Sequence, residues 1–165
     1  MAIGDVNGDG LDDIVVANTE ELPTDTLIFP QLSSGGFGTA NAVASYPNAG
    51  QPLLADMNND GRKDLVVTHD PFGYVGLYLQ QADGSLGTEQ LLGGGTTVLL
   101  ANQEPVVNLA AGDLNGDGFK DIAVATGAGV VVFLSRSTGA APAARPALSA
   151  AGRVVGATRP PRKAH

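Results

Sequence analysis

The stretch Asp5–Asp13 reads DVNGDGLDD and runs directly into the apolar segment IVVA. The chain repeats this arrangement twice: DMNNDGRKD at residues 56–64 is followed by LVVT, and DLNGDGFKD at residues 113–121 is followed by IAVA. The shared pattern is D-x-N-x-D-G-x-x-D, and successive copies begin 51 and 57 residues apart. A motif that recurs at such a period is typical of repeat architectures, so it decides the fold class.

The side chains of the repeated loop have the chemistry of a calcium site. Asp, Asn, Asp and Asp stand at positions one, three, five and nine of each copy, and position seven offers a backbone carbonyl. Ca²⁺ takes about six to eight oxygen ligands of these kinds. The glycine at position six permits a sharp turn, because glycine adopts positive φ at little cost. The alternative is that the loops are three Asp/Asn turns that bind no metal.

Two helical calcium motifs that begin in the same way are excluded. An EF-hand loop needs a bidentate Glu at position twelve and a helix after it. Position twelve here is Val16, Val67 or Val124, and the segment after each loop is short and β-branched. Such a segment favours a buried strand, which also argues against a dockerin-type module. Each loop is therefore predicted to lead into a strand, with the Asp at the strand entrance closing the site.

With these features the chain resembles the FG-GAP/VCBS-type repeats, the blades of calcium-binding β-propellers such as the integrin α-subunit head and many bacterial secreted proteins. The resemblance covers residues 2–139 and implies up to three structural Ca²⁺ sites. The side-chain ligands would be Asp5, Asn7, Asp9, Asp13, Asp56, Asn58, Asp60, Asp64, Asp113, Asn115, Asp117 and Asp121. The backbone carbonyls would come from Leu11, Arg62 and Phe119.

Between the loops each unit repeats the same run of strands. Strands are predicted at residues 14–17, 26–29, 42–46, 51–55, 65–68, 75–78, 89–92, 106–111, 122–125 and 130–134, with an extra strand possible at 96–100. About four strands per ~50 residues predict an all-β fold, namely a partial β-propeller of about two and a half to three four-stranded blades. Residues 1–139 would form the blades. A closed propeller needs at least four, so we expect a fragment that needs further blades in a longer chain or self-association.

Charge and composition change abruptly after the third unit. All 17 acidic residues lie at or before Asp121, whereas residues 140–165 are rich in Ala, Pro and Arg and contain no acidic residue. This tail is predicted to be disordered. The acidic body argues against nucleic-acid binding, and no apolar run is long enough to span a membrane. The chain contains no cysteine, and its first residues do not read as a signal peptide.

The leading functional hypothesis is a calcium-stabilised extracellular or cell-surface scaffold that presents loops to a protein or glycan partner, as in adhesion, without catalysis. The alternatives are part of a propeller-type polysaccharide hydrolase or lyase, or a lectin-like sugar-binding propeller. His69 is interpreted as a polar loop residue rather than a general base. Phe37 and Tyr78 are predicted to be core residues, and Phe72 and Tyr74 are the candidates for an exposed aromatic contact.

Overall fold

The computed structural model describes residues 1–17, 25–69, 74–93, 106–126 and 129–135. Every regular element in these ranges is a β-strand: β1 Ala2–Gly4, β2 Asp13–Ala17, β3 Asp25–Phe29, β4 Asn41–Ala44, β5 Ala49–Ala55, β6 Asp64–His69, β7 Tyr74–Tyr78, β8 Gln90–Gly93, β9 Val106–Gly112, β10 Asp121–Thr126 and β11 Gly129–Phe133. No helix in the described part is long and apolar enough to cross a membrane. The predicted tail at 140–165 and the possible strand at 96–100 lie outside the described residues.

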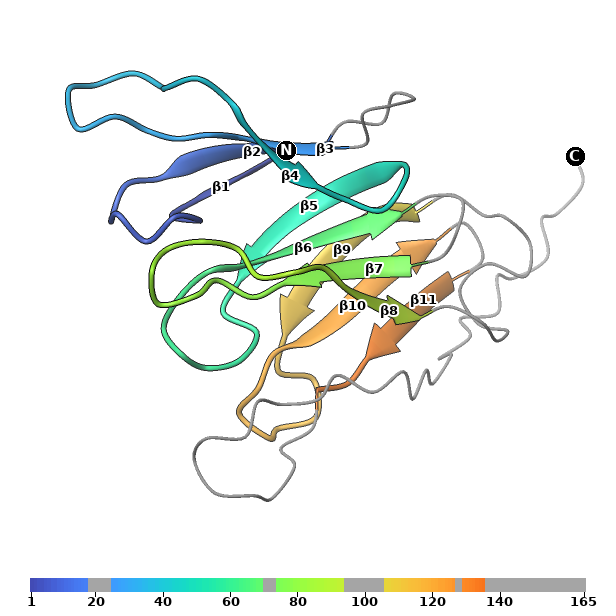
Figure 1. Ribbon diagram of the computed structural model, residues 1–165. Coiled ribbons are helices and arrows are strands. Elements are labelled where there is room, and N and C mark those ends of the chain that lie inside the picture. The colour runs from blue at the N-terminus through green and yellow to red at the C-terminus, as the bar shows by residue number, and fades with distance from the viewer. Residues whose placement is uncertain (18–24, 70–73, 94–105, 127–128, 136–165) are drawn as a thin grey trace, which may run out of the picture.

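The strands form three small antiparallel sheets that follow one another along the chain. Their orders are β1-β2-β3-β4, β5-β6-β7-β8 and β11-β10-β9. Every neighbouring pair is antiparallel, and within each sheet the strands that follow one another in the chain are neighbours. The three sheets are stacked, with the second between the other two (Figure 1). This arrangement confirms the all-β prediction of successive blade-like units, two with four strands and a third with three in the described residues.

The stacking buries two apolar clusters, one on each face of the middle sheet. One cluster joins the first and second sheets and contains Val6, Val15, Ile28, Leu65, Val67 and Tyr78. The other joins the second and third sheets and includes Val66, Val75, Leu77, Ile122, Val124 and Phe133. Side chains alternate between the two faces of a strand, so neighbours along β6 enter different clusters. Because both faces are covered, all six residues of β6 are buried.

The third and fourth strands of the first two sheets are joined by matching turns. An isolated bridge closes each turn, between Gln31 and Phe37 in the first unit and between Gln80 and Leu86 in the second. Gly35 and Gly84 occupy the same place in these turns, and their φ angles are 91° and 83°. The repeat therefore extends through the whole unit, as the sequence pattern predicts.

Candidate functional site

The three D-x-N-x-D-G-x-x-D motifs form equivalent loops. Each connects the first and second strands of its sheet: β1 to β2, β5 to β6, and β9 to β10. We call the segments 5–13, 56–64 and 113–121 loop 1, loop 2 and loop 3. The loops lie at the same edge of the stacked sheets (Figure 1). All ligand residues predicted from the sequence lie within them.

The ninth residue of each loop is a buried aspartate that ties three segments together. Asp13, Asp64 and Asp121 have no exposed surface. One carboxylate oxygen accepts the N–H of the second loop residue, at 3.2, 2.8 and 2.8 Å in loops 1, 2 and 3. The other accepts the N–H of a residue just beyond the third strand of the sheet, at 3.0, 2.9 and 2.8 Å. Those residues are Gln31, Gln80 and Ser135, and they were not singled out from the sequence.

The first residue of each loop accepts hydrogen bonds from the glycine turn. The N–H of the sixth residue lies 2.9 Å from Oδ2 of Asp5, Asp56 and Asp113 in the respective loops. The glycines that donate have φ angles of 84°, 85° and 86°. An L-residue with a side chain adopts such angles only at a cost. The turn glycine is therefore required by the backbone geometry in all three copies.

The third and fifth residues contact each other in the same way in every loop. The Asn amide oxygen accepts the N–H of the fifth residue, at 2.9, 3.1 and 2.9 Å. The Asn amide N–H₂ donates to the Asp carboxylate at the fifth position, at 3.1, 2.8 and 3.0 Å. In loop 1 the same group also lies 3.4 Å from Asp13 Oδ1. The positive end of an amide dipole thus lies against the fifth-position carboxylate in each loop.

Burial and loop amides shift the pKa values of these carboxyl groups in opposite directions. Burial raises the pKa of Asp64 to about 6, against hydrogen bonds from the Met57 and Gln80 amides that lower it. Burial also raises the pKa of Asp13. The exposed Asp113 has a lowered pKa, chiefly because it accepts the Gly118 N–H. Desolvation disfavours a charged carboxylate, whereas N–H donors favour it, so Asp13 and Asp64 have the stronger electrostatic need for a cation.

Loop 2 departs from the other two loops at two positions. At position seven, the Arg62 guanidinium forms an ion pair with Asp60, and its Nε donates to the Gln80 carbonyl at 3.1 Å. Leu11 and Phe119 stand at that position in the other loops. At position four, loop 2 has Asn59 where loops 1 and 3 have glycine. Asn59 donates to the Gly118 carbonyl of loop 3 at 2.7 Å.

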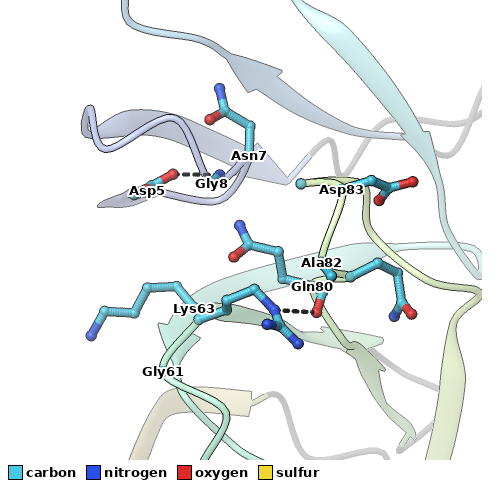
Figure 2. A pocket seen from close by; sticks show the side chains of 11 residues that line it. Asp5, Asn7, Gly8, Gly61, Lys63, Gln80, Ala82 and Asp83 are labelled. Carbon is cyan, nitrogen blue, oxygen red and sulfur yellow. Dashed lines mark hydrogen bonds between the residues drawn. The ribbon is translucent and has the colours of Figure 1, made fainter.

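A pocket of about 450 Å³ lies between loop 1 and the turn that follows β7. Its lining includes Asp5, Asn7, Arg62 and Gln80. Figure 2 shows the Gln80 side chain between Asn7 of loop 1 and Lys63 of loop 2. The turn meets loop 1 at Gly84, where an added Cβ would lie 1.9 Å from the Asn7 carbonyl oxygen. A glycine is therefore needed where these two units touch.

The loops carry the oxygen donors that a hard cation binds, but these donors do not already surround a single point. Within the described ranges, no three His, Cys, Asp or Glu side chains form a group that could hold a metal ion. The loop carboxylates instead accept backbone and amide N–H groups. Carboxylate, amide and carbonyl oxygens are nevertheless the donors that Ca²⁺ takes, and each carboxylate oxygen has lone pairs for more than one partner. The donor set fits calcium.

Three expectations for residues outside the loops were wrong. His69 lies in β6 with no exposed surface, and its Nε2 is 2.7 Å from Glu89 Oε1. Sequence reasoning missed Glu89 because it lies 20 residues further along the chain. Tyr74 is the first residue of β7, and its ring packs on Tyr46 with the centroids 5.1 Å apart, so it is not an exposed turn residue.

Phe37 is the third correction. It is 48% exposed, whereas Tyr78 is 1% exposed and belongs to the core as predicted. Leu86, at the position that matches Phe37, packs against the cluster between the first and second sheets. Phe37 lies in the turn between β3 and β4 of the first unit, and the described residues place no further sheet beyond the first sheet on that side. Phe72 lies outside the described part of the chain.

Comparison with known families agrees with the repeated loops and stacked sheets. Residues 5–67 and residues 56–124 each match the FG-GAP-like repeat. Each match begins at the first Asp of a loop and ends in the strand that follows the next loop. Together the two matches cover most of the chain and include all three loops. The chain therefore belongs to the FG-GAP-like repeat family.

Proposed function

We propose that the chain is a calcium-binding β-propeller-type repeat module. Each loop would hold one structural Ca²⁺, with the ligands named above: side-chain oxygens from positions one, three, five and nine, and the backbone carbonyl from position seven. The bound ion would offset the repulsion between the loop carboxylates and fix the turn. Because the loops connect paired strands, free energy of binding becomes free energy of folding.

One observation supports this proposal more than the others. In all three loops an Asn N–H₂ group donates to the carboxylate at the fifth position. An amide dipole carries only a partial positive charge, so it compensates that carboxylate incompletely. A divalent cation would compensate it better. The raised pKa of Asp64 points the same way, because an ionised carboxylate at that buried place lacks a full counter-charge.

The proposed role is that of an extracellular or cell-surface scaffold rather than of an enzyme. Extracellular calcium modules bind with dissociation constants of about 10⁻⁴–10⁻³ M, so such loops would fill outside cells and be mostly empty in the cytosol. The loops would serve only as structural metal sites. The partner, a protein or a glycan, would contact other surfaces of the stacked sheets. Further blades, in the same chain or in a second copy, would cover the outer sheets.

Isothermal titration calorimetry and far-UV circular dichroism test the proposal directly. We expect calcium, and not an equal concentration of magnesium, to bind with millimolar or tighter affinity and to raise the melting temperature relative to EDTA. Asp9→Ala removes a proposed ligand of loop 1 and should abolish one binding event. Asp12→Ala is the matched control, because it removes an equally exposed neighbouring carboxylate outside the ligand set. A melt that is indifferent to calcium, with no heat of binding, would refute the metal assignment.

A further inference from the structure

Asn59 has a backbone conformation that only one other non-glycine residue shares in the described part of the chain. Its φ angle is 58°, and the other such residue is Asn48. Asn tolerates this region better than most residues, but glycine suits it best. The equivalent residues Gly8 and Gly116 have φ angles of 78° and 79°. Loop 2 therefore carries a side chain at a position where the other loops carry none.

That side chain crosses from one loop to the next. Asn59 Nδ2 lies 2.7 Å from the Gly118 carbonyl oxygen, although the two residues are 59 positions apart in the chain. Asn59 stands between the proposed ligands Asn58 and Asp60. Gly118 stands between the proposed ligands Asp117 and Phe119, and its own N–H donates to Asp113. A single hydrogen bond thus joins the two ligand-bearing backbones.

Among the described residues, loop 1 has no hydrogen bond of this kind to another loop. Gly8 at its fourth position has no side chain that can donate, and its nearest neighbour from another unit is the Gly84 Cα, 3.4 Å from the place of an added Cβ. Contact between loop 1 and the second unit is therefore one of van der Waals packing. Loops 2 and 3 are joined by the Asn59 hydrogen bond. Loop 1 lacks it and serves as the reference loop in the experiment below.

We propose that Asn59 couples the two loops, so that a cation bound in either loop 2 or loop 3 raises the affinity of the other. The inference rests on the proposed calcium function. A cation that fixes one loop backbone also fixes the hydrogen-bond partner of the other, so the second cation has less conformational entropy left to overcome. The effect must be reciprocal. A hydrogen bond contributes about 0.5–1.5 kcal/mol, which corresponds to an affinity factor of about two to ten.

The chain contains no Trp, so an introduced Trp can report on one loop alone. Phe119→Trp places the indole at position seven of loop 3, where it would sensitise the luminescence of bound Tb³⁺, used as the probe for calcium. Loop 2 is disabled by Asp56→Asn together with Asp60→Asn. We expect this change to weaken terbium binding in loop 3 about two- to tenfold. In the Asn59→Gly background, the same change should have less than about a twofold effect.

Two controls separate coupling from general electrostatics. Leu11→Trp reports on loop 1, whose affinity should respond to the loss of the loop 2 charges equally with and without Asn59→Gly. Asn59→Gly introduces the residue that already stands at this position in loops 1 and 3, so the turn keeps its conformation. If circular dichroism shows that this variant is unfolded, Asn59→Asp replaces it, because Asp tolerates the same φ and has no N–H to donate.

The outcomes distinguish the two proposals. Terbium that binds loop 3 equally well with and without a functional loop 2 would overturn the coupling and leave the calcium sites standing. Coupling that survives Asn59→Gly unchanged would overturn the role of Asn59. No sensitised luminescence from either Trp reporter, together with no heat of calcium binding, would refute the proposed function, and the coupling with it.

Discussion

Gly84→Ala should destabilise the protein far more than Gly35→Ala, although both glycines occupy the same place in matching turns. Their φ angles are 83° and 91°, so either alanine would enter the left-handed region at a cost of about 1–2 kcal/mol. The surroundings differ. A Cβ on Gly35 would meet nothing within 4 Å, whereas a Cβ on Gly84 would lie 1.9 Å from the Asn7 carbonyl oxygen.

The difference between the two variants measures the contact between the first two units. An approach of 1.9 Å forces the turn away from loop 1, and overpacking of this kind costs about 1–3 kcal/mol. We therefore expect the free energy of unfolding to fall by about 1–2 kcal/mol in Gly35→Ala and by about 2–5 kcal/mol in Gly84→Ala. Urea denaturation followed by far-UV circular dichroism, at one fixed calcium concentration, measures both. Equal losses in the two variants would refute the packing of this turn on loop 1.

Three further predictions concern the second unit. Burial raises the pKa of Asp64 to about 6, above its unfolded value of about 3.9, so ionisation of this group destabilises the fold increasingly as pH rises from about 3.9 to about 6. In EDTA, the free energy of unfolding measured in urea should therefore rise by about 1 kcal/mol as pH falls from 7 to 5, and a steady fall would contradict the burial of an ionisable Asp64. Because Arg62 pairs with a proposed ligand of loop 2, Arg62→Leu should tighten calcium binding there by about two- to fivefold in calorimetry. Lys63→Leu should tighten it less, and an equal effect of both would mean that net charge alone is responsible. A Cβ on Gly76 would lie 2.0 Å from Glu89 Oε1, so Gly76→Ala should lower the free energy of unfolding by about 1–3 kcal/mol. When Glu89→Ala is already present, Gly76→Ala should cause a smaller additional loss. Strictly additive losses in this double-mutant cycle would show that the two residues do not meet.

Much of the fold follows from the sequence because its signals are local. The β-branched run after each loop predicts β2, β6 and β10, and the structure extends these strands by only one or two residues beyond the predicted ends. Turn glycines and the repeated motif mark where the strands must connect. Such signals depend on neighbours in the chain, so they are visible without knowledge of the stacking.

What the sequence did not predict depends on contacts between sheets. Both faces of β6 are covered, so the alternation of polar and apolar residues does not show which way His69 points, and its partner Glu89 follows a different turn. Phe37 and Leu86 match in sequence, yet they differ in burial because only Leu86 faces another described sheet. The Asn59 bond to loop 3 likewise joins units that are far apart in the chain.

In the candidate sites, too, local features could be predicted and contacts between distant segments could not. Residue types and spacing were enough to select the proposed ligand positions, since those positions lie within nine consecutive residues. The anchoring amides of Gln31, Gln80 and Ser135 were not found, because they follow the third strand and the ninth Asp reaches them through space. The only available signal was the matching place of the two glutamines, one in each of the first two units.

The buried aspartate at position nine has a consequence for which substitutions the repeat can tolerate over evolutionary time. Its two oxygens each accept a backbone N–H, so an Asn here would turn its own N–H₂ donor toward one of those N–H groups. A Glu would add a methylene to a place without room for solvent. The residues at positions one, three and five, which are partly or fully exposed, carry no such restriction from the core. A descendant that no longer needed a metal would be free to vary those three positions and would still have to keep the aspartate at position nine. An aspartate retained alone at the strand entrance would then be the trace of a lost site.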